Sequence, residues 1–277
     1  MSHFSKEFFK YSGLVIIIGF AMVFAFIFEL PDEKFHINFL DIGQGDGIFI
    51  KTPENYQILI DGGPNDKVLE ELNKVMPFYD KSIDFIVLTH PHADHINGLL
   101  EVIKKYDVES ILITGVEYSN RNYQEMMSIL REKDMNIYIA EKNQDFSFGS
   151  TILDVIYPFK PLISQDFENV NNSSIGIMVG FKDKKILLTG DLEIEGETEL
   201  LRYKNLKADI FKAGHHGSKT SSTPALLEKV QPEIVVIQSG KGNKFNHPSK
   251  ETLENFQQLG ITKVRRNDLE GRIEFVF

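Results

Sequence analysis

Apolar residues recur along this chain with two different spacings, which predict strands and helices in alternation. Phe35, Ile37 and Phe39 occupy every second position, as in a strand with one buried face. The apolar run 83–88 predicts a buried strand, and the residues after the next loop follow the i, i+3, i+4, i+7 spacing of a helix with one apolar face, namely Ile96, Leu99, Leu100 and Ile103. The loop 89–95 therefore joins a strand to a helix.

Two halves of the chain share this alternation. In the first half we expect strands near 48–51, 57–60, 110–114, 136–140 and 151–157, and helices over 68–76 and 122–133. The second half predicts strands at 175–181, 185–189, 209–213, 233–238 and 272–277, with helices over 193–203, after Thr223-Pro224 and from Ser249 to Gly260. The irregular stretch 158–172 is a crossing between the halves or a mobile lid. The order predicts an α/β protein.

The loop between the first buried strand and its helix contains three histidines and an aspartate within six residues, namely His90, His92, Asp94 and His95. Imidazole nitrogens and carboxylate oxygens are ligands for zinc and manganese, and rings two residues apart in a tight loop can converge on one ion. Asp94 and His95 would then face a second ion. The alternative is a polar loop whose Asp94 caps the helix. Because the chain has no cysteine, any ion must be held by His, Asp, Glu or Asn.

The amino-terminal segment is apolar enough to predict a membrane anchor. Residues 12–28 carry no charge, Lys6 and Lys10 precede them, and acidic residues follow. A helix over Ser12–Leu30 would be about 28 Å long, close to the thickness of the hydrocarbon layer. The basic residues on its amino side predict a cytoplasmic tip, a single pass through the cell membrane and an extracytoplasmic body. A cleaved signal peptide and a buried core helix are the alternatives.

Further motifs occur in an order that resembles a known family. His90-x-His92-x-Asp94-His95 resembles the HxHxDH signature of the metallo-β-lactamase-fold hydrolases. Together with the segments 40–46, 61–63, 188–191 and 215–220, it makes residues 34–277 similar to the C-terminal hydrolase domain of the ComEC/Rec2 competence proteins. The resemblance implies an αββα sandwich over 34–277, preceded by residues 1–33 as tip, transmembrane helix and linker.

The resemblance also implies two divalent metal ions, zinc or manganese. An aspartate at the end of a buried strand can serve both ions, and Asp191 is our candidate; the alternative is a cap for the helix that follows. Either His215 or His216 completes the second ion's set, and we favour His215. Where related branches carry a histidine, this chain has Asn171-Asn172-Ser173-Ser174, which would weaken the first ion. The predicted ligands are His90, His92, Asp94, His95, Asp191 and His215.

Other polar residues near these motifs are candidates for catalysis, substrate binding or support. Asp94, His216 and His247 are the catalytic candidates, and His247 could donate a proton to a leaving alkoxide. Asp46 and Asp61 are expected to support the site, with a surface turn as the alternative for Asp61. The candidates for substrate binding offer amides, hydroxyls and ammonium groups to phosphate oxygens: Asn172, Ser174, Ser218, Lys219, Thr220 and Lys241.

The implied reaction is hydrolysis by a metal-bound hydroxide, and the resemblance favours DNA or another phosphodiester as the substrate. The net charge of −10 argues against a nucleic-acid partner, but residues 212–250 contain six lysines and two acids. We expect Lys219, Lys241 and Lys244 to line the approach. The alternatives are a hydrolase of another envelope ester, such as a phosphocholine ester, and a degenerate metal-binding module. The resembled proteins' channel region has no counterpart here, so separate channel or competence proteins are possible partners.

Overall fold

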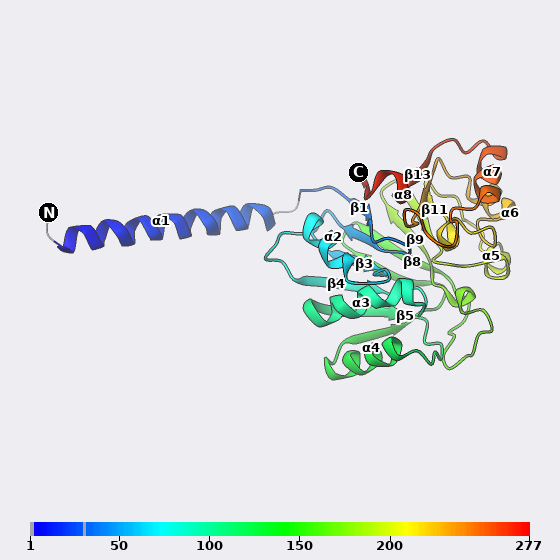
Figure 1. Cartoon of the computed structure of the whole chain (residues 1–277), viewed down its shortest axis with the longest axis horizontal. Helices are drawn as coiled ribbons and strands as arrows, with labels where there is room; N and C mark the ends of the chain where they lie inside the picture. Colours follow the sequence, from blue (N-terminus) through cyan, green and yellow to red (C-terminus); the bar gives the residue numbers. More distant parts are fainter. Residues whose placement is uncertain (1–2, 30–31) are drawn as a thin grey trace.

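The computed structural model describes the backbone of residues 3–29 and 32–277 and the side chains of residues 11–24 and 32–277. Two seven-stranded sheets form the body (Figure 1). The first has the order β14-β1-β2-β3-β4-β5-β6, from β1 (His36–Phe39), β2 (Ile48–Lys51), β3 (Gln57–Ile60), β4 (Ser82–Val87), β5 (Asp107–Ile113), β6 (Asn136–Ile139) and β14 (Ile273–Val276). The second has the order β13-β12-β11-β10-β9-β8-β7, from β7 (Gln144–Phe148), β8 (Thr151–Tyr157), β9 (Gly176–Phe181), β10 (Lys184–Leu188), β11 (Ile210–Lys212), β12 (Ile234–Ile237) and β13 (Val264–Arg266).

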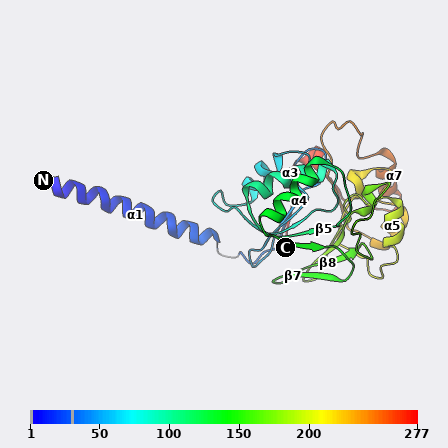
Figure 2. The ribbon, with the colours of Figure 1, turned by 90° about the horizontal axis from the view of Figure 1, so that it is seen from below.

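Helices cover the outer face of each sheet, which confirms the predicted αββα sandwich (Figure 2). The first sheet packs against α2 (Lys67–Val75), α3 (Ala93–Lys105) and α4 (Arg121–Glu132). The second packs against α5 (Ile194–Leu200), α6 (Pro224–Val230) and α7 (Lys250–Gln258). A short helix, α8 (Asn267–Glu270), joins β13 to β14, and two 3-10 turns cover Val170–Ser173 and Gly214–Gly217.

The core between the sheets is built by alternate residues of each strand. Ile37 and Phe39 of β1 and Ile48 and Ile50 of β2 point inward, where they join Phe181 and other residues of the second sheet. Side chains of the opposite parity, such as Phe49, pack under the outer helices instead. Both faces of each sheet are therefore buried, and the body has three apolar layers that hold the strand ends in place.

The strand directions determine where the loops meet. β1 is antiparallel to β2 and β2 is antiparallel to β3, whereas β3, β4 and β5 are parallel. β1, β3 and β4 therefore all run in one direction. In the second sheet β10, β11 and β12 are also parallel. Most residues of the site described below lie in the loops that follow β3, β4, β10 and β11. β1 begins at the opposite end of the strands, where β3 and β4 also begin.

The N-terminal helix α1 (His3–Glu29) extends away from the body in both views (Figures 1 and 2). Its described side chains, residues 11–24, are mostly exposed, so it is not the buried core helix that was one alternative. Among the residues that the structure describes, no helix combines the length and hydropathy needed to cross a membrane, and the predicted transmembrane span over Ser12–Leu30 is not supported. The side chains of Lys6, Lys10 and Glu29, and all of Leu30, lie outside the described residues.

Three short elements were not expected from the sequence. β7 was missed because Asp145 and Ser147 alternate with only two phenylalanines, a weak strand pattern. β13 is an edge strand whose three residues are all half-buried, and α8 is a single turn. The predicted caps of α6 and α7 are confirmed, because the Thr223 and Ser249 hydroxyls accept hydrogen bonds from the backbone N–H of Leu226 and Thr252.

Candidate metal centre

The loop after β4 forms the centre of the site, and the β1–β2 loop packs directly on it. Gly45 has a φ of +142°, and a Cβ atom there would lie 2.2 Å from the backbone oxygen of Asp94. Only glycine permits this approach, which lets the N–H of Asp46 donate a hydrogen bond to the same oxygen at 3.3 Å. The tight loop between β1 and β2 thus brings the Asp46 carboxylate to the site.

Four predicted residues converge on one point at the ends of β4, β10 and β11. Oδ2 of Asp191 lies 3.2 Å from Nε2 of His95 and 3.2 Å from Nε2 of His216. Asp94 reaches the same His216 atom with Oδ2 at 3.2 Å. One ligand atom from each of Asp94, His95, Asp191 and His216 lies within 4.8 Å of the others. Asp191 therefore contacts both histidines of this group, and its role as a ligand shared by two ions stays a prediction.

His90 and His92 form the other side of the site. Nε2 of His90 lies 3.1 Å from Nδ1 of His92, and the ring centroids of His90 and His95 are 4.2 Å apart. Nδ1 of His90 contacts the Ser174 hydroxyl at 3.2 Å, which also accepts a hydrogen bond from the N–H of Asp191. Ser174 is fully buried, so it orients the His90 ring instead of facing substrate as predicted.

The structure favours His216 over His215, contrary to our expectation. His216 is buried and belongs to the cluster, whereas Nε2 of His215 is 3.9 Å from Asp191 and its Nδ1 pairs with Glu193 at 3.1 Å. Both histidines have positive φ, 46° and 55°, in the tight turn after β11. That turn, which the sequence pattern does not reveal, decides which of the two neighbouring rings points inward.

Two aspartates behind the ligands hold the rings in place. Asp61 is fully buried and accepts hydrogen bonds from the backbone N–H and hydroxyl of Thr89, and it lies 2.8 Å from Nδ1 of His95. Asp46 lies 3.1 Å from Nδ1 of His216. Each carboxylate therefore leaves Nε2 of its histidine free to face the centre, as expected for supporting residues.

Lys212 is a part of the site that we did not predict. It was counted among the six lysines of residues 212–250, but it lies on β11, is 1% exposed and forms an ion pair with Asp46. Its Nζ also donates to the backbone oxygen of Gly190 at 3.2 Å and lies 3.7 Å from Oδ1 of Asp191. The only local signal in the sequence was a lysine within an otherwise apolar strand.

Carboxylates and imidazoles shift one another's pKa values in this buried cluster. Burial lowers the pKa of His90 and His92, which leaves their rings neutral. Burial also acts to lower the pKa of His95 and His216, but Asp191, with Asp61 or Asp46, raises both pKa values well above the usual range. Burial acts to raise the pKa of Asp191, but His216 and His95 hold it well below its usual value. The cluster therefore favours positive charge beside its carboxylates.

This donor set fits divalent metal ions. Oδ1 of Asp191 is buried and has no hydrogen-bond partner among the described residues. Neutral His90 and His92 present ring nitrogens, and an ion beside Asp94 and Asp191 would replace the protons that those carboxylates favour on His95 and His216. Nitrogen and carboxylate ligands suit zinc and manganese alike, so the geometry does not identify the metal.

Other predicted residues have roles different from those expected. Asn172 accepts hydrogen bonds from the N–H groups of Glu193 and Gly196, so its side-chain oxygen binds the backbone at the start of α5 instead of facing substrate. Asp94 and Asp191 do not cap helices; the caps of α3 and α5 are His92 and Glu193. The remaining candidates lie around the rim. Ser218 and Thr220 are joined by their hydroxyls at 2.9 Å, and Lys219 and Lys241 are exposed.

His247 lies on the rim beside the cluster. Its ring centroid is 5.5 Å from that of His215 and 6.5 Å from that of His216. Burial and these two histidines lower the pKa of His247 to about 4. The ring is therefore neutral at neutral pH, which favours it as a hydrogen-bond partner and disfavours the predicted role of proton donor.

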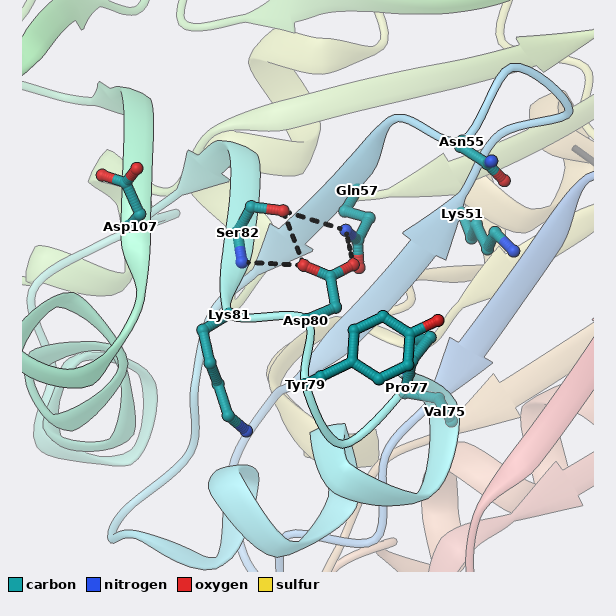
Figure 3. A pocket seen from close by; sticks show the side chains of 10 residues that line it. All are labelled: Lys51, Asn55, Gln57, Val75, Pro77, Tyr79, Asp80, Lys81, Ser82 and Asp107. Carbon is teal, nitrogen blue, oxygen red and sulfur yellow. Dashed lines mark hydrogen bonds between the residues drawn. The ribbon is translucent and has the colours of Figure 1, made fainter. Parts of the chain in front are cut away.

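A separate hollow of about 470 Å³ lies at the opposite edge of the first sheet, where β3 and β4 begin (Figure 3). Asp80 accepts hydrogen bonds there from Gln57 Nε2 at 2.7 Å and from the Ser82 hydroxyl at 2.7 Å. These polar groups satisfy one another, and we assign no reaction to this hollow. The chemistry of the chain is concentrated at the other ends of the strands.

Comparisons with known proteins agree with this geometry. Residues 40–241 match the family model of the metallo-beta-lactamase superfamily, and the chain belongs to that superfamily. It is 30% identical over 272 residues to ComE operon protein 3 of Bacillus subtilis, and the aligned region covers 92% of this chain and 34% of that protein. It is 26% identical over 277 residues to Recombination protein 2 of Haemophilus influenzae, and this alignment covers 95% of this chain and 32% of that protein. The predicted resemblance is thereby confirmed, and the chain spans about a third of the length of these relatives.

Two further similarities are more limited. Exodeoxyribonuclease YycJ of Bacillus anthracis is 34% identical over 74 residues, which are 26% of this chain and 28% of that protein. The crystal structure of the metallo-beta-lactamase fold protein YhfI from Bacillus subtilis superposes with a TM-score of 0.54 at 10% identity, covering 87% of this chain and 99% of that one. The structural likeness supports the fold alone. The family match and the His/Asp cluster together identify the chain as a metal-dependent hydrolase of this superfamily.

Proposed function

We propose that the chain is a metal-dependent phosphodiesterase that cleaves nucleic acid, with DNA as its substrate. The observation that carries the proposal is the buried group of Asp94, His95, Asp191 and His216, with the rings of His90 and His92 next to His95. His90 and His92 would hold one ion with Asp191, and Asp94, His95 and His216 would hold the other with Asp191. Bound ions supply positive charge that lowers the pKa of a water molecule and stabilises negative charge on a phosphate.

The chain's own residues supply the rest of the site. Lys219 and Lys241 are exposed on the loops that follow β11 and β12, so they can attract a polyanion to a chain whose overall charge is −10. Ser218 and Thr220 offer hydroxyls on the same rim. Neutral His247 can donate one hydrogen bond to a phosphate oxygen and accept one from water. The partial likeness to a protein named an exodeoxyribonuclease supports the choice of DNA.

The test is a substrate comparison in Mn²⁺ or Zn²⁺. Purified chain is incubated with single-stranded DNA, bis-p-nitrophenyl phosphate, p-nitrophenylphosphocholine and a β-lactam. We expect cleavage of the DNA and of the simple phosphodiester, and no cleavage of the β-lactam. Hydrolysis of the phosphocholine ester without cleavage of DNA would favour the small-ester alternative. A chain that binds no metal would be the degenerate module.

Attachment to the membrane is a separate proposal, which rests on the sequence alone. In it, the segment around residues 12–28 anchors the chain, the body lies outside the cytoplasm, and separate channel or competence proteins deliver the substrate. Protease added to intact spheroplasts should then digest the body. Digestion only after lysis would place the body on the cytoplasmic side.

A further inference from the structure

An exposed phenylalanine stands at the edge of the metal centre on the loop between β12 and α7. Phe245 is 53% exposed, and its ring stacks on His247 with centroids 5.8 Å apart and an interplanar angle of 26°. His247 in turn lies beside His215 and His216. The aromatic surface is therefore continuous from solvent to the ligand cluster.

The loop that carries Phe245 is fixed in shape by one side chain. The amide of Asn243 accepts hydrogen bonds from the N–H groups of Phe245 and His247 at 3.1 and 3.0 Å. It donates to the backbone oxygens of Gly240 and His247 at 2.9 and 2.6 Å. Because one amide binds both arms of the loop, the backbone at Phe245 is held in one shape, and its ring stacks on His247.

Both ends of the loop are attached to the site. The N–H of Gly240 donates to the side-chain oxygen of Gln44 at 3.1 Å, next to the β1–β2 loop. At the other end, the N–H of Ser249 donates to the oxygen of Gly217 at 2.9 Å. Gly217 has a φ of +81°, and a Cβ atom there would lie 2.7 Å from Pro248. The loop is thus held against the turn that positions His216.

One lysine lies over the exposed ring, and a second is exposed on the same loop. Nζ of Lys244 lies 5.1 Å from the Phe245 ring centroid, and Lys241 is exposed four residues earlier. A rigid, exposed aromatic ring flanked by lysines is the arrangement with which proteins hold single-stranded nucleic acid, since the lysines attract phosphates and the ring stacks on a base. A small phosphate ester has no base to use such a ring.

We propose that Phe245, supported by His247, is a stacking platform for a base next to the phosphate that is cleaved, and that the substrate is therefore a single strand with accessible bases. This inference rests on the proposed nuclease function and adds the requirement that the substrate has accessible bases. A duplex, whose bases are already stacked, would use the platform poorly, and a strand without bases would not use it at all.

The experiment compares two single strands of equal length and charge, one of thymidine residues and one of abasic residues. We expect the wild-type chain to bind the thymidine strand several-fold more tightly in EDTA and to cleave it with a lower KM in Mn²⁺. Phe245→Ala and Phe245→Leu should bring the ratio between the two strands close to one, a loss of about fivefold or more in discrimination. Phe78→Ala, which removes an 83% exposed phenylalanine far from the site, should keep the wild-type ratio.

A spectroscopic measurement distinguishes stacking from a structural effect. The chain contains no tryptophan, so Phe245→Trp introduces a single tryptophan at the platform, which can be excited apart from the nine tyrosines. The thymidine strand should quench this fluorescence and the abasic strand should not, and the substitution should retain discrimination. Cleavage of both strands with equal KM by the wild type would overturn the platform and leave the nuclease function intact. Failure to bind or cleave either strand, with hydrolysis of small phosphodiesters retained, would overturn both.

Discussion

Asp46 and Lys212, 166 residues apart in the sequence, form a buried ion pair behind the metal centre. The other carboxylate oxygen of Asp46 lies 3.1 Å from Nδ1 of His216, so the pair links a cation in the core to the orientation of a ligand ring. Burial alone would lower the pKa of Lys212, but Asp46 and Asp191 raise it above its usual value, and the ammonium stays charged. The second sheet thus supplies a fixed positive charge beside the Asp191 carboxylate.

Loss of this lysine should destabilise the fold. Lys212→Met leaves the Asp46 carboxylate buried without its partner, which typically costs about 3–5 kcal/mol. The double variant Asp46→Asn, Lys212→Met should recover much of that loss, as measured by chemical denaturation in a double-mutant cycle. Lys184→Met, which removes a surface lysine 3.8 Å from Asp209 on the same sheet, should cost less than about 1 kcal/mol. Equal losses at both lysines would show that Lys212 has no special role.

Asp191→Asn should reduce bound metal and activity together. The amide keeps the shape of the side chain but removes the charge that faces both His95 and His216. We expect a loss of well over tenfold in metal affinity, measured by titration calorimetry, with a parallel loss of activity on bis-p-nitrophenyl phosphate. Asp183→Asn, in the exposed turn between β9 and β10, is the matched control. Full metal content in Asp191→Asn would remove the shared ligand from the site.

The two neighbouring histidines should respond differently to substitution. His216→Ala removes a buried ring that contacts Asp94 and Asp191 at 3.2 Å, so metal affinity should fall by more than tenfold. His215→Ala removes a ring that is 3.9 Å from Asp191 and pairs with Glu193, so the loss of affinity should be clearly smaller. Metal content measured after gel filtration decides between them. The reverse order would restore His215 as the ligand.

The exposed lysines should matter only for a polyanionic substrate. Lys219→Ala combined with Lys241→Ala should raise KM for a DNA oligonucleotide several-fold and flatten its dependence on salt, because fewer phosphate contacts release fewer counterions. The effect on a small phosphodiester should be much weaker. The control is Lys229→Ala, because the Nζ of Lys229 donates to the backbone oxygen of Leu201; this variant should keep the wild-type KM for DNA. Equal losses on both substrates would mean that the lysines support the ligands instead.

His247 should make stability depend on pH in the acidic range. Its pKa is about 4 in the folded chain, below the ordinary histidine pKa of about 6.5, so the unfolded chain binds more protons between these values. The contribution of His247 is therefore fully present above pH 6.5 and is lost as the pH falls toward 4. His247→Gln should show a smaller drop in unfolding free energy between pH 7 and pH 5 than the wild type, both measured in EDTA. An identical drop would refute the shift.

The sequence pattern was most informative where local chemistry and tertiary structure agree. β8 has the predicted bounds, Thr151–Tyr157, because its apolar positions alternate right after the turn at Gly149. His90 and His92 lie in the loop after β4, and Asp94 and His95 lie in the first turn of α3, so the proximity of these four residues needs no long-range information. Lys212 could not be placed this way, since its partner Asp46 belongs to the other sheet. Nor could spacing separate His215 from His216, because a turn with two positive φ values makes the choice.

The direction of β1 governs which side of the body the site faces. β1 runs parallel to β4, so α1 joins the body near the end of the sheet where β4 begins. His90 lies at the other end, just after β4 stops. A strand of six residues spans about 20 Å. Under the proposed function and attachment, the ligand cluster would lie at the far end of the strands from the surface that holds α1, and a linear substrate emerging beside α1 would run the length of the sheet before it was cut. The first phosphate within reach of the site would already be several nucleotides clear of that surface.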